Sequence, residues 1–93
     1  MLYVVAYDIA DDKRRKKLSD LLEGYGYRVQ YSVYEIELSA SKLERLLFEI
    51  ERRELFDSDI DSIRIYHIHK TSVGNSFELC RRADPFQNED LFV

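Results

Sequence analysis

Hydrophobic positions change their spacing along the chain, and each change marks a new predicted element. Residues 2–7 form a continuous apolar run, too short for a helix, which predicts a central strand covered on both faces. From Asp11 the apolar residues recur at helical spacing, with Asp11 as the N-cap and Gly24 and Gly26 as the stop. The predicted apolar stripe of this helix consists of Leu18, Leu21, Leu22 and Tyr25.

The middle of the chain predicts two short strands and a second helix. Residues 27–38 are rich in β-branched and aromatic side chains, but their apolar positions switch parity between Val33 and Tyr34. Because successive side chains of a strand point to opposite faces, a bulge or a very tight turn is expected near residues 30–32. Ser41 and Glu44 have the spacing of a capping box, which predicts the start of the helix. Its apolar stripe is Leu43, Leu46, Leu47 and Ile50.

The last third of the chain predicts a fourth strand and a tail. An acidic loop at residues 57–61 precedes residues 62–68, whose apolar positions alternate as in a strand. Phe77, Leu79 and Cys80 suggest a brief fifth strand. Residues 84–93 contain three acids and no base. We predict that residues 81–93 form a tail that is mobile or bound to a partner.

The order strand, helix, strand, strand, helix, strand is the ferredoxin-like βαββαβ pattern. It predicts an α+β domain over residues 1–80, with an antiparallel four-stranded sheet and a short extra C-terminal strand. Both helices then lie on one face of the sheet, and the other face is bare. Apolar residues on a bare face need a cover, and a second copy of the same sheet provides one. We therefore expect a homodimer that forms through the sheet faces.

Composition narrows the classes of function. The net charge is −4, yet residues 1–34 carry six Lys and Arg against five Asp and Glu. Any nucleic-acid contact is therefore expected in this first third and should depend on salt. No apolar run approaches the roughly 20 residues of a membrane span, and no secretory leader pattern opens the chain. With one cysteine, Cys80, no internal disulfide can form, so we expect a cytoplasmic protein.

Asp8 is the leading candidate for chemistry because it ends the first strand. It could be a turn residue whose carboxylate accepts backbone N–H groups before the helix. It could instead bind Mg²⁺, which often takes one or two carboxylates and completes its octahedron with water and phosphate oxygens. In a two-fold dimer, Asp8 of the second copy would provide the second carboxylate. Asp11 and Asp12 are further candidate ligands, although both already have a structural role at the helix start.

Residues 13–17 are all Lys or Arg, at a helix start where cations oppose the macrodipole. Such a block is often a solvated helix face, and polyanion binding is the alternative. Extending the apolar stripe back by one turn selects Arg14 and Arg15, which should lie near the end of the first strand. Arg28 begins an edge-like strand, where a charge also guards against aggregation.

Four polar or aromatic side chains have structural as well as functional interpretations. Ser32 and Tyr34 are compatible with turn chemistry and core packing. His67 and His69 could bind zinc, but no third histidine or cysteine is placed to help them, and packing or solvent exposure is the alternative. No nucleophile elbow, P-loop or dinucleotide fingerprint occurs.

Four segments in order and spacing resemble the family of CRISPR-associated protein two, a small endoribonuclease and adaptation partner of the CRISPR integrase. They are residues 4–9 (VVAYDI), 11–15 (DDKRR), 25–35 (YGYRVQYSVYE) and 61–66 (DSIRIY). The resemblance spans residues 1 to about 70. It implies a ferredoxin-like homodimer in which the last strand packs on the partner's sheet. The histidines at 67 and 69 and the acidic tail depart from it.

The resemblance also implies roles for individual residues. Asp8 would be the catalytic residue and, with Asp8 of the second copy, the ligand of Mg²⁺, which Mn²⁺ could replace. Arg14 or Arg15, together with Arg28, would contact phosphate. Ser32 matches a serine of the family, and Tyr34 stands where phenylalanine is common; we group both with the substrate-binding residues.

Three functions follow from these observations. The first is a Mg²⁺-dependent endonuclease that cuts single-stranded RNA, or double-stranded DNA, and takes part in spacer acquisition in antiviral defence. The second is an architectural dimer that bridges integrase dimers and positions spacer DNA without cutting it. The third is a toxin-type ribonuclease of the same fold. The sequence leaves the choice between RNA and DNA open.

Overall fold

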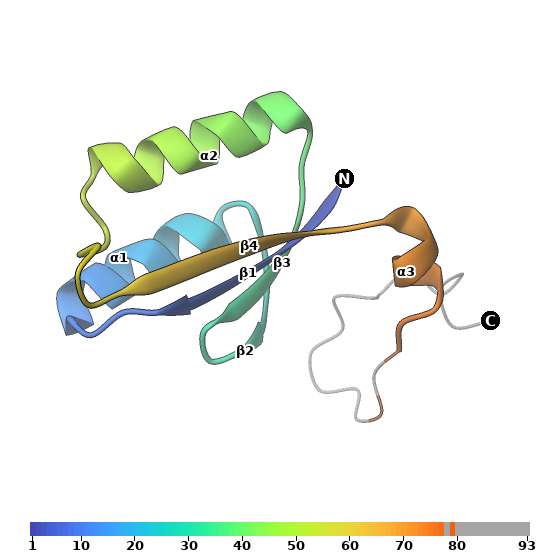
Figure 1. The fold of residues 1–93 in the computed structure, drawn as a ribbon, viewed down its shortest axis with the longest axis horizontal. Coiled ribbons are helices and arrows are strands. Elements are labelled where there is room, and N and C mark those ends of the chain that lie inside the picture. Colours follow the sequence, from blue (N-terminus) through green and yellow to red (C-terminus); the bar gives the residue numbers. More distant parts are fainter. Residues whose placement is uncertain (78, 80–93) are drawn as a thin grey trace.

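Four strands form one antiparallel sheet in the order β2-β3-β1-β4 (Figure 1). The structure is a computed structural model, and it describes residues 1–77 and 79. The strands are β1 (Leu2–Asp8), β2 (Gly26–Gln30), β3 (Val33–Glu37) and β4 (Ser62–Ile68). With two long helices in the predicted positions, this is the α+β arrangement that the sequence predicts.

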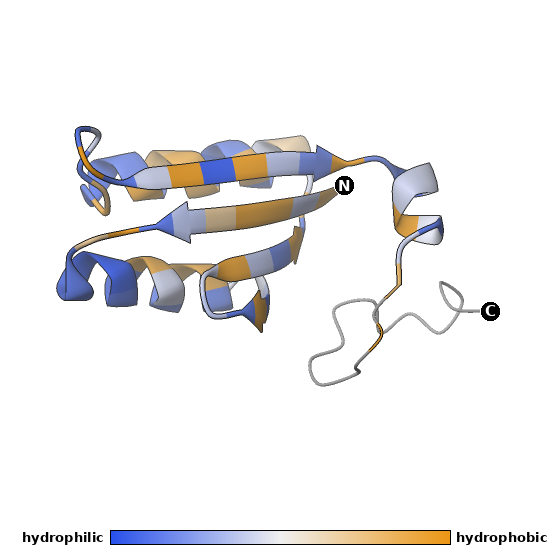
Figure 2. Ribbon diagram, turned by 60° about the horizontal axis from the view of Figure 1, so that its bottom comes forward, coloured by the Kyte–Doolittle hydropathy of each residue, from blue (hydrophilic) through white to orange (hydrophobic). Residues whose placement is uncertain are grey.

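Helices α1 (Asp12–Glu23) and α2 (Ala40–Arg52) pack on the same face of the sheet, and Figure 2 shows the strands in front of both of them. The core lies between these layers because every second residue of β1 and β3 points toward the helices. Its fully buried members include Val5, Leu18, Leu22, Tyr34, Ile36, Leu46 and Leu55. The sheet and the two apolar helix stripes therefore share one hydrophobic core.

The two helix starts test the predicted caps. Asp11 caps α1, since its side chain accepts a hydrogen bond from the Arg14 backbone N–H at 2.9 Å. The predicted cap of α2 is wrong: Ser39, and not Ser41, accepts the N–H bond of Lys42. The helix therefore begins at Ala40, earlier than the capping-box spacing indicated.

The hairpin from β2 to β3 explains the parity switch in the sequence. Tyr31 and Ser32 form a turn, and a bulge shifts the register between Arg28 and Gln30. Both devices that the sequence allowed are therefore present. At the start of β2, a Cβ on Gly26 would lie 2.3 Å from the Glu35 carbonyl oxygen, so only glycine fits there.

After β4 the chain forms a short helix that the sequence pattern did not predict. This helix, α3 (Lys70–Gly74), lies beyond the end of β4 and away from the two long helices (Figure 1). Phe77 follows it without strand structure. The rest of the predicted fifth strand, with Cys80, and the predicted tail at residues 81–93 lie outside the described residues, apart from the exposed Leu79.

The face of the sheet opposite the helices carries apolar side chains that are exposed or partly exposed to solvent. Val4 of β1 lies directly beside Tyr66 of β4, and Leu2 lies beside Ile68. The side chain of Tyr66 is exposed, and the other three are partly exposed. The structure thus has the uncovered apolar sheet face that the sequence predicted. The homodimer expected to form through this face stays a prediction.

Candidate active site

Asp8 is the last residue of β1, where the strand leaves the sheet toward α1 (Figure 1). It pairs with Ser62 across β1 and β4, and it is exposed. Within residues 1–77 and 79, its carboxylate forms no hydrogen bond or ion pair. The turn-residue interpretation required backbone N–H donors to this carboxylate, and the structure does not provide them.

Two neighbouring carboxylates, those of Asp11 and Asp61, accept the backbone N–H groups in this region instead. Asp11 caps α1, and its bond from the Arg14 N–H lowers the pKa of Asp11. Asp61 accepts the backbone N–H groups of Ala10 at 2.9 Å and Asp57 at 2.7 Å. These two bonds are the main reason why the pKa of Asp61 is lowered. Both acids are therefore held as anions by the backbone, and Asp8 stays available for a ligand.

Asp61 is a structural residue that sequence reasoning missed. The pattern placed it in an acidic loop, but its side chain is fully shielded from solvent and joins the loop before β4 to the start of α1. The available signal was its position directly before a strand that pairs with β1. A buried carboxylate at such a junction satisfies backbone donors that the sheet and helix leave open.

Arg14 and Arg15 lie where helix phase predicted, near the end of β1, but they differ in their contacts. Arg14 donates to Asp61 at 3.1 Å, and its Nε is buried without a partner among the described residues. Arg15 donates from Nη1 to the carbonyl of Ile9 at 2.9 Å and from Nη2 to the carboxylate of Asp12. The bond to Asp12 raises the pKa of Arg15. The Arg15 guanidinium thus contacts the residue that follows Asp8.

Arg28 is held by a polar network on the inner face of α1. Its Nη2 donates to Ser19 Oγ at 2.8 Å, and its Nε donates to the Tyr34 hydroxyl at 3.3 Å. The Tyr34 hydroxyl also lies 2.8 Å from Ser19 Oγ and 3.2 Å from Glu23 Oε1. The bond to Tyr34 raises the pKa of Arg28. The guanidinium is thereby oriented, and close to half of the side chain stays exposed.

Tyr34 positions Arg28 within this network, and Ser32 lies outside it. The Tyr34 ring is fully buried, so it orients Arg28 and does not itself present a surface to a substrate. The Ser32 carbonyl accepts the Tyr7 N–H at 3.1 Å, which ties the hairpin turn to β1. Ser19, which the sequence analysis missed, is the buried centre of the network. It lies one helical turn after Arg15, and that spacing was a usable signal.

The Arg28 network borders an open groove of about 460 Å³, which we call the α1 groove. It is lined by Tyr7, Asp12, Arg15, Lys16, Ser19, Asp20, Glu23, Arg28 and Tyr31. Burial raises the pKa of Tyr7, so its phenol stays protonated at neutral pH and is unsuited to act as a base. The α1 groove therefore offers hydrogen-bond donors and three cations, each of which is paired with an acid of the same lining.

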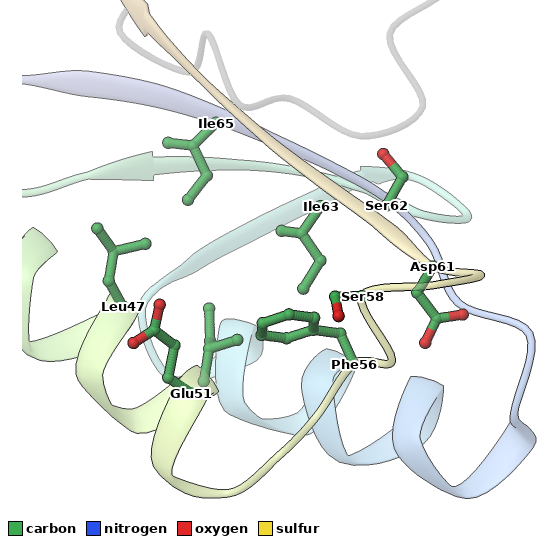
Figure 3. A pocket seen from close by; sticks show the side chains of 9 residues that line it. Leu47, Glu51, Phe56, Ser58, Asp61, Ser62, Ile63 and Ile65 are labelled. Carbon is green, nitrogen blue, oxygen red and sulfur yellow. The ribbon is translucent and has the colours of Figure 1, made fainter.

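A second hollow, of about 410 Å³, lies between α2, the loop after it and β4 (Figure 3). Its walls combine apolar and polar side chains, and Leu47, Phe56 and Ile63 face the space. Asp61 stands at one end with its carboxylate turned toward α1 and Arg14. The side chains that line this hollow thus pack on the far side of Asp61. None of them is a cation, in contrast to the α1 groove.

The two histidines have structural contacts. The His67 ring lies 5.2 Å from the ring of Tyr3, centroid to centroid. His69 caps α3, since its Nδ1 accepts the Thr71 N–H at 3.2 Å. No group of three potential ligands for a metal occurs in the part of the chain that the structure describes. A zinc site built on these histidines therefore finds no support.

The donor set at Asp8 fits half of a magnesium site. Asp8 offers one exposed carboxylate without a partner in the described chain, and no cluster of three acidic or histidine ligands is found there. Mg²⁺ accepts one or two carboxylates and fills its remaining positions with water and phosphate oxygens. In such a site one copy of the chain would supply one ligand, and a second copy would supply the other.

A comparison with known proteins identifies the family of this chain. The family model described as CRISPR associated protein Cas2 matches residues 1–76. The chain belongs to this family. A Cas2 endoribonuclease of Synechocystis is 58% identical over 65 residues, which cover 70% of this chain and 68% of the relative. A Cas2 endoribonuclease of Chloroflexus aurantiacus is 41% identical over 100% of this chain and 99% of its own length.

Solved Cas2 structures share the fold. Cas2 from Streptococcus pyogenes superposes with a TM-score of 0.73 at 27% identity, over 86% of this chain and 100% of that one. A chain of a partial Cas6-RT-Cas1–Cas2 complex gives a TM-score of 0.64 at 33% identity, over 84% of this chain and 89% of that one.

Among the described residues, no helix has the length and apolar character needed to cross a bilayer.

Proposed function

We propose that this Cas2 family member is a metal-dependent endonuclease that acts on nucleic-acid phosphodiesters during spacer acquisition. The observation that carries the proposal is the exposed carboxylate of Asp8, which has no partner among the described residues, beside the acids Asp11, Asp12 and Asp61, each of which has one. A carboxylate kept clear of intramolecular partners at a strand end is suited to a ligand. The relatives named as endoribonucleases, and the neighbour in a Cas1–Cas2 complex, support the substrate class and an integrase partner.

The site needs two copies of the chain. The partly exposed apolar face of β1 and β4, with Val4 beside Tyr66, is the surface on which a second sheet would pack. Asp8 lies on that same face, because side chains alternate along β1. A homodimer through this face would bring Asp8 toward its symmetry mate. The two carboxylates would then hold one Mg²⁺, or Mn²⁺ in its place.

The residues of the chain have distinct tasks in this proposal. A bound Mg²⁺ would act as a Lewis acid on the scissile phosphate and supply the charge that the developing transition state needs. Arg15, fixed to the Ile9 carbonyl, would bind a phosphate oxygen next to Asp8. Arg28, oriented by Ser19 and Tyr34, would bind a second phosphate along the α1 groove. RNA is the first substrate to test, and duplex DNA is the second.

The test is cleavage by purified wild-type protein and by Asp8→Asn, with Asp59→Asn as the matched control. Asp59 is an exposed acid in the loop before β4, so the control also removes one negative charge. We expect Asp8→Asn to lose cleavage by about 100-fold or more, the order that follows loss of one electrostatic group in a transition state. Asp59→Asn should cut like wild type. Cleavage that persists in Asp8→Asn contradicts the proposal.

A second function is favoured by a specific observation. Arg14 and Arg28 both have intramolecular acceptors, as expected of residues that shape a surface rather than reach into a reaction. The chain would then be an architectural dimer that bridges integrase dimers and positions spacer DNA. Spacer acquisition in cells that carry Asp8→Asn separates the two: acquisition at the wild-type rate favours the architectural role, and its loss favours the endonuclease.

A further inference from the structure

Tyr31 is an aromatic side chain that the proposed chemistry does not use. It lies in the turn between β2 and β3, and it is 75% exposed. A turn of this kind is commonly built from small polar residues, and a large exposed ring adds no packing to the core. The ring nevertheless has a defined place, because it lines the α1 groove.

Two guanidinium groups accompany the Tyr31 ring. The Arg28 guanidinium carbon lies 6.0 Å from its centroid. Arg15 lines the same groove as Tyr31. An aromatic face beside arginine donors is the combination with which proteins bind single-stranded nucleic acids. The base stacks on the ring, and the arginines contact the backbone.

The charges of the α1 groove strengthen the case for stacking. Each of its three cations has an acidic partner, in the pairs Arg15 with Asp12, Lys16 with Asp20 and Arg28 with Glu23. The lining is therefore close to neutral, and net charge alone attracts a phosphate backbone weakly. Exposed ion pairs are weak enough for phosphate oxygens to replace the acids. A ligand must gain a further part of its affinity from a contact that does not depend on charge.

We propose that Tyr31 is a stacking platform for an unpaired base of a single-stranded nucleic acid, with Arg15 and Arg28 holding the flanking phosphates. This inference rests on the endonuclease function and deepens it by naming a residue that would recognise a base of the substrate. A base inside a duplex is already stacked between its neighbours and cannot offer its face to the ring. The platform therefore selects single strands over duplexes at this groove.

The test measures binding without divalent metal, so that no cleavage is required. Wild-type protein, Tyr31→Ala and Tyr31→Phe are titrated, by fluorescence anisotropy, into a labelled single-stranded RNA, the same backbone with abasic positions, and the matching duplex. We expect Tyr31→Ala to bind the single strand about 10-fold more weakly, the order expected for one lost base stack. Tyr31→Phe should stay within about twofold of wild type, because it keeps the ring.

Two controls separate stacking from an indirect effect on Arg28. The slope of log affinity against log salt should be the same for wild type and Tyr31→Ala, since no cation is removed. The abasic backbone and the duplex should bind both proteins alike. An equal loss on all three probes, unchanged binding of the single strand, or no measurable binding by wild type would overturn the platform.

The outcome is independent of the test of the endonuclease itself. An active nuclease that depends on Asp8, combined with unchanged binding by Tyr31→Ala, removes the platform and leaves the proposed function intact. Cleavage that persists in Asp8→Asn removes the proposed catalytic mechanism, and a base-dependent loss of binding in Tyr31→Ala would still stand.

Discussion

Tyr34→Phe tests whether the buried Tyr34 hydroxyl holds Arg28 against α1. The substitution keeps the ring, so core packing is preserved and only hydrogen bonds are lost. Ser19 Oγ keeps its 2.8 Å bond from Arg28, and the side chains of Arg28 and Glu23 both reach solvent. The Ser19 carbonyl, which the Tyr34 hydroxyl also contacts at 3.3 Å, lies within α1, where the N–H four residues on is its helical partner. The free energy of unfolding should therefore fall by the net value of one hydrogen bond, about 1 kcal/mol.

The assay is thermal unfolding followed by circular dichroism. For a chain of this size, about 1 kcal/mol lowers the midpoint by about 4–8 °C. Protein concentration is held fixed, because association with a second copy also shifts the midpoint. Tyr27→Phe is the matched control: Tyr27 is 60% exposed and its hydroxyl forms no hydrogen bond within the described residues, so its cost should stay below about 0.5 kcal/mol. Equal falls for the two variants would refute the reasoning, as would a loss above about 3 kcal/mol for Tyr34→Phe, which would reveal an unpaired buried group.

Three further substitutions test other parts of the structure. Gly26→Ala should lower the free energy of unfolding by about 1–3 kcal/mol, because the new Cβ would lie 2.3 Å from the Glu35 carbonyl oxygen and 2.7 Å from Ile36 Cγ1; an unchanged denaturation midpoint in urea would contradict the close approach of β2 to β3. Glu54→Gly should raise the free energy of unfolding by roughly 0.5–1 kcal/mol, because Glu54, which follows the C-cap residue Arg53 of α2, has a φ of 52°, a conformation that glycine adopts without a Cβ clash; a lower melting temperature would count against this. Asp61→Asn should make the free energy of unfolding depend less on pH in the acid range. In the wild type, the folded-state pKa of Asp61 lies below the ordinary 3.8, so the ionised carboxylate stabilises the protein above that pH. This stabilisation is lost as the pH falls through the lowered folded-state pKa. Melting temperatures between about pH 5 and about pH 2 should therefore fall less steeply in the variant than in wild type, and parallel curves would argue against the role of this carboxylate.

The elements with strong periodicity were predictable from the sequence, and the weakly patterned ones were not. The helix of residues 12–23 has apolar positions at helical spacing in its second half, and the strand of residues 2–8 is apolar from residue 2 to residue 7, so local pattern and tertiary packing agree. The short helix of residues 70–74 has no apolar stripe, and its start depends on a cap from His69. At the second long helix, Ser39 and Ser41 are equivalent as caps by residue type. The choice follows from tertiary structure, since the Leu38 N–H bonds to the Met1 carbonyl at 2.8 Å and fixes where the chain leaves the sheet.

In the candidate site, likewise, the positions of some residues were predictable from the sequence and their contact partners were not. Helix phase was enough to place Arg14 and Arg15 at the end of β1, because one element determines their direction. The partners of Arg14 and Arg28 were not predictable. The bond from Arg14 to Asp61 joins residues that are 47 positions apart, and no local spacing encodes that contact. The positioning role of Tyr34 likewise depends on the helix that covers it.

The central claim is that Asp8 is half of a metal site that a second copy completes. The direct measurement is a crystal structure of the protein grown with Mn²⁺ or Mg²⁺, from which the distance between the two Asp8 carboxylates of a dimer is read. With metal–oxygen bonds of about 2.0–2.1 Å, shared coordination predicts carboxylate oxygens within roughly 4 Å of each other and an ion between them. A dimer that keeps the two carboxylates well beyond about 8 Å apart, with no ion between them, would contradict the claim.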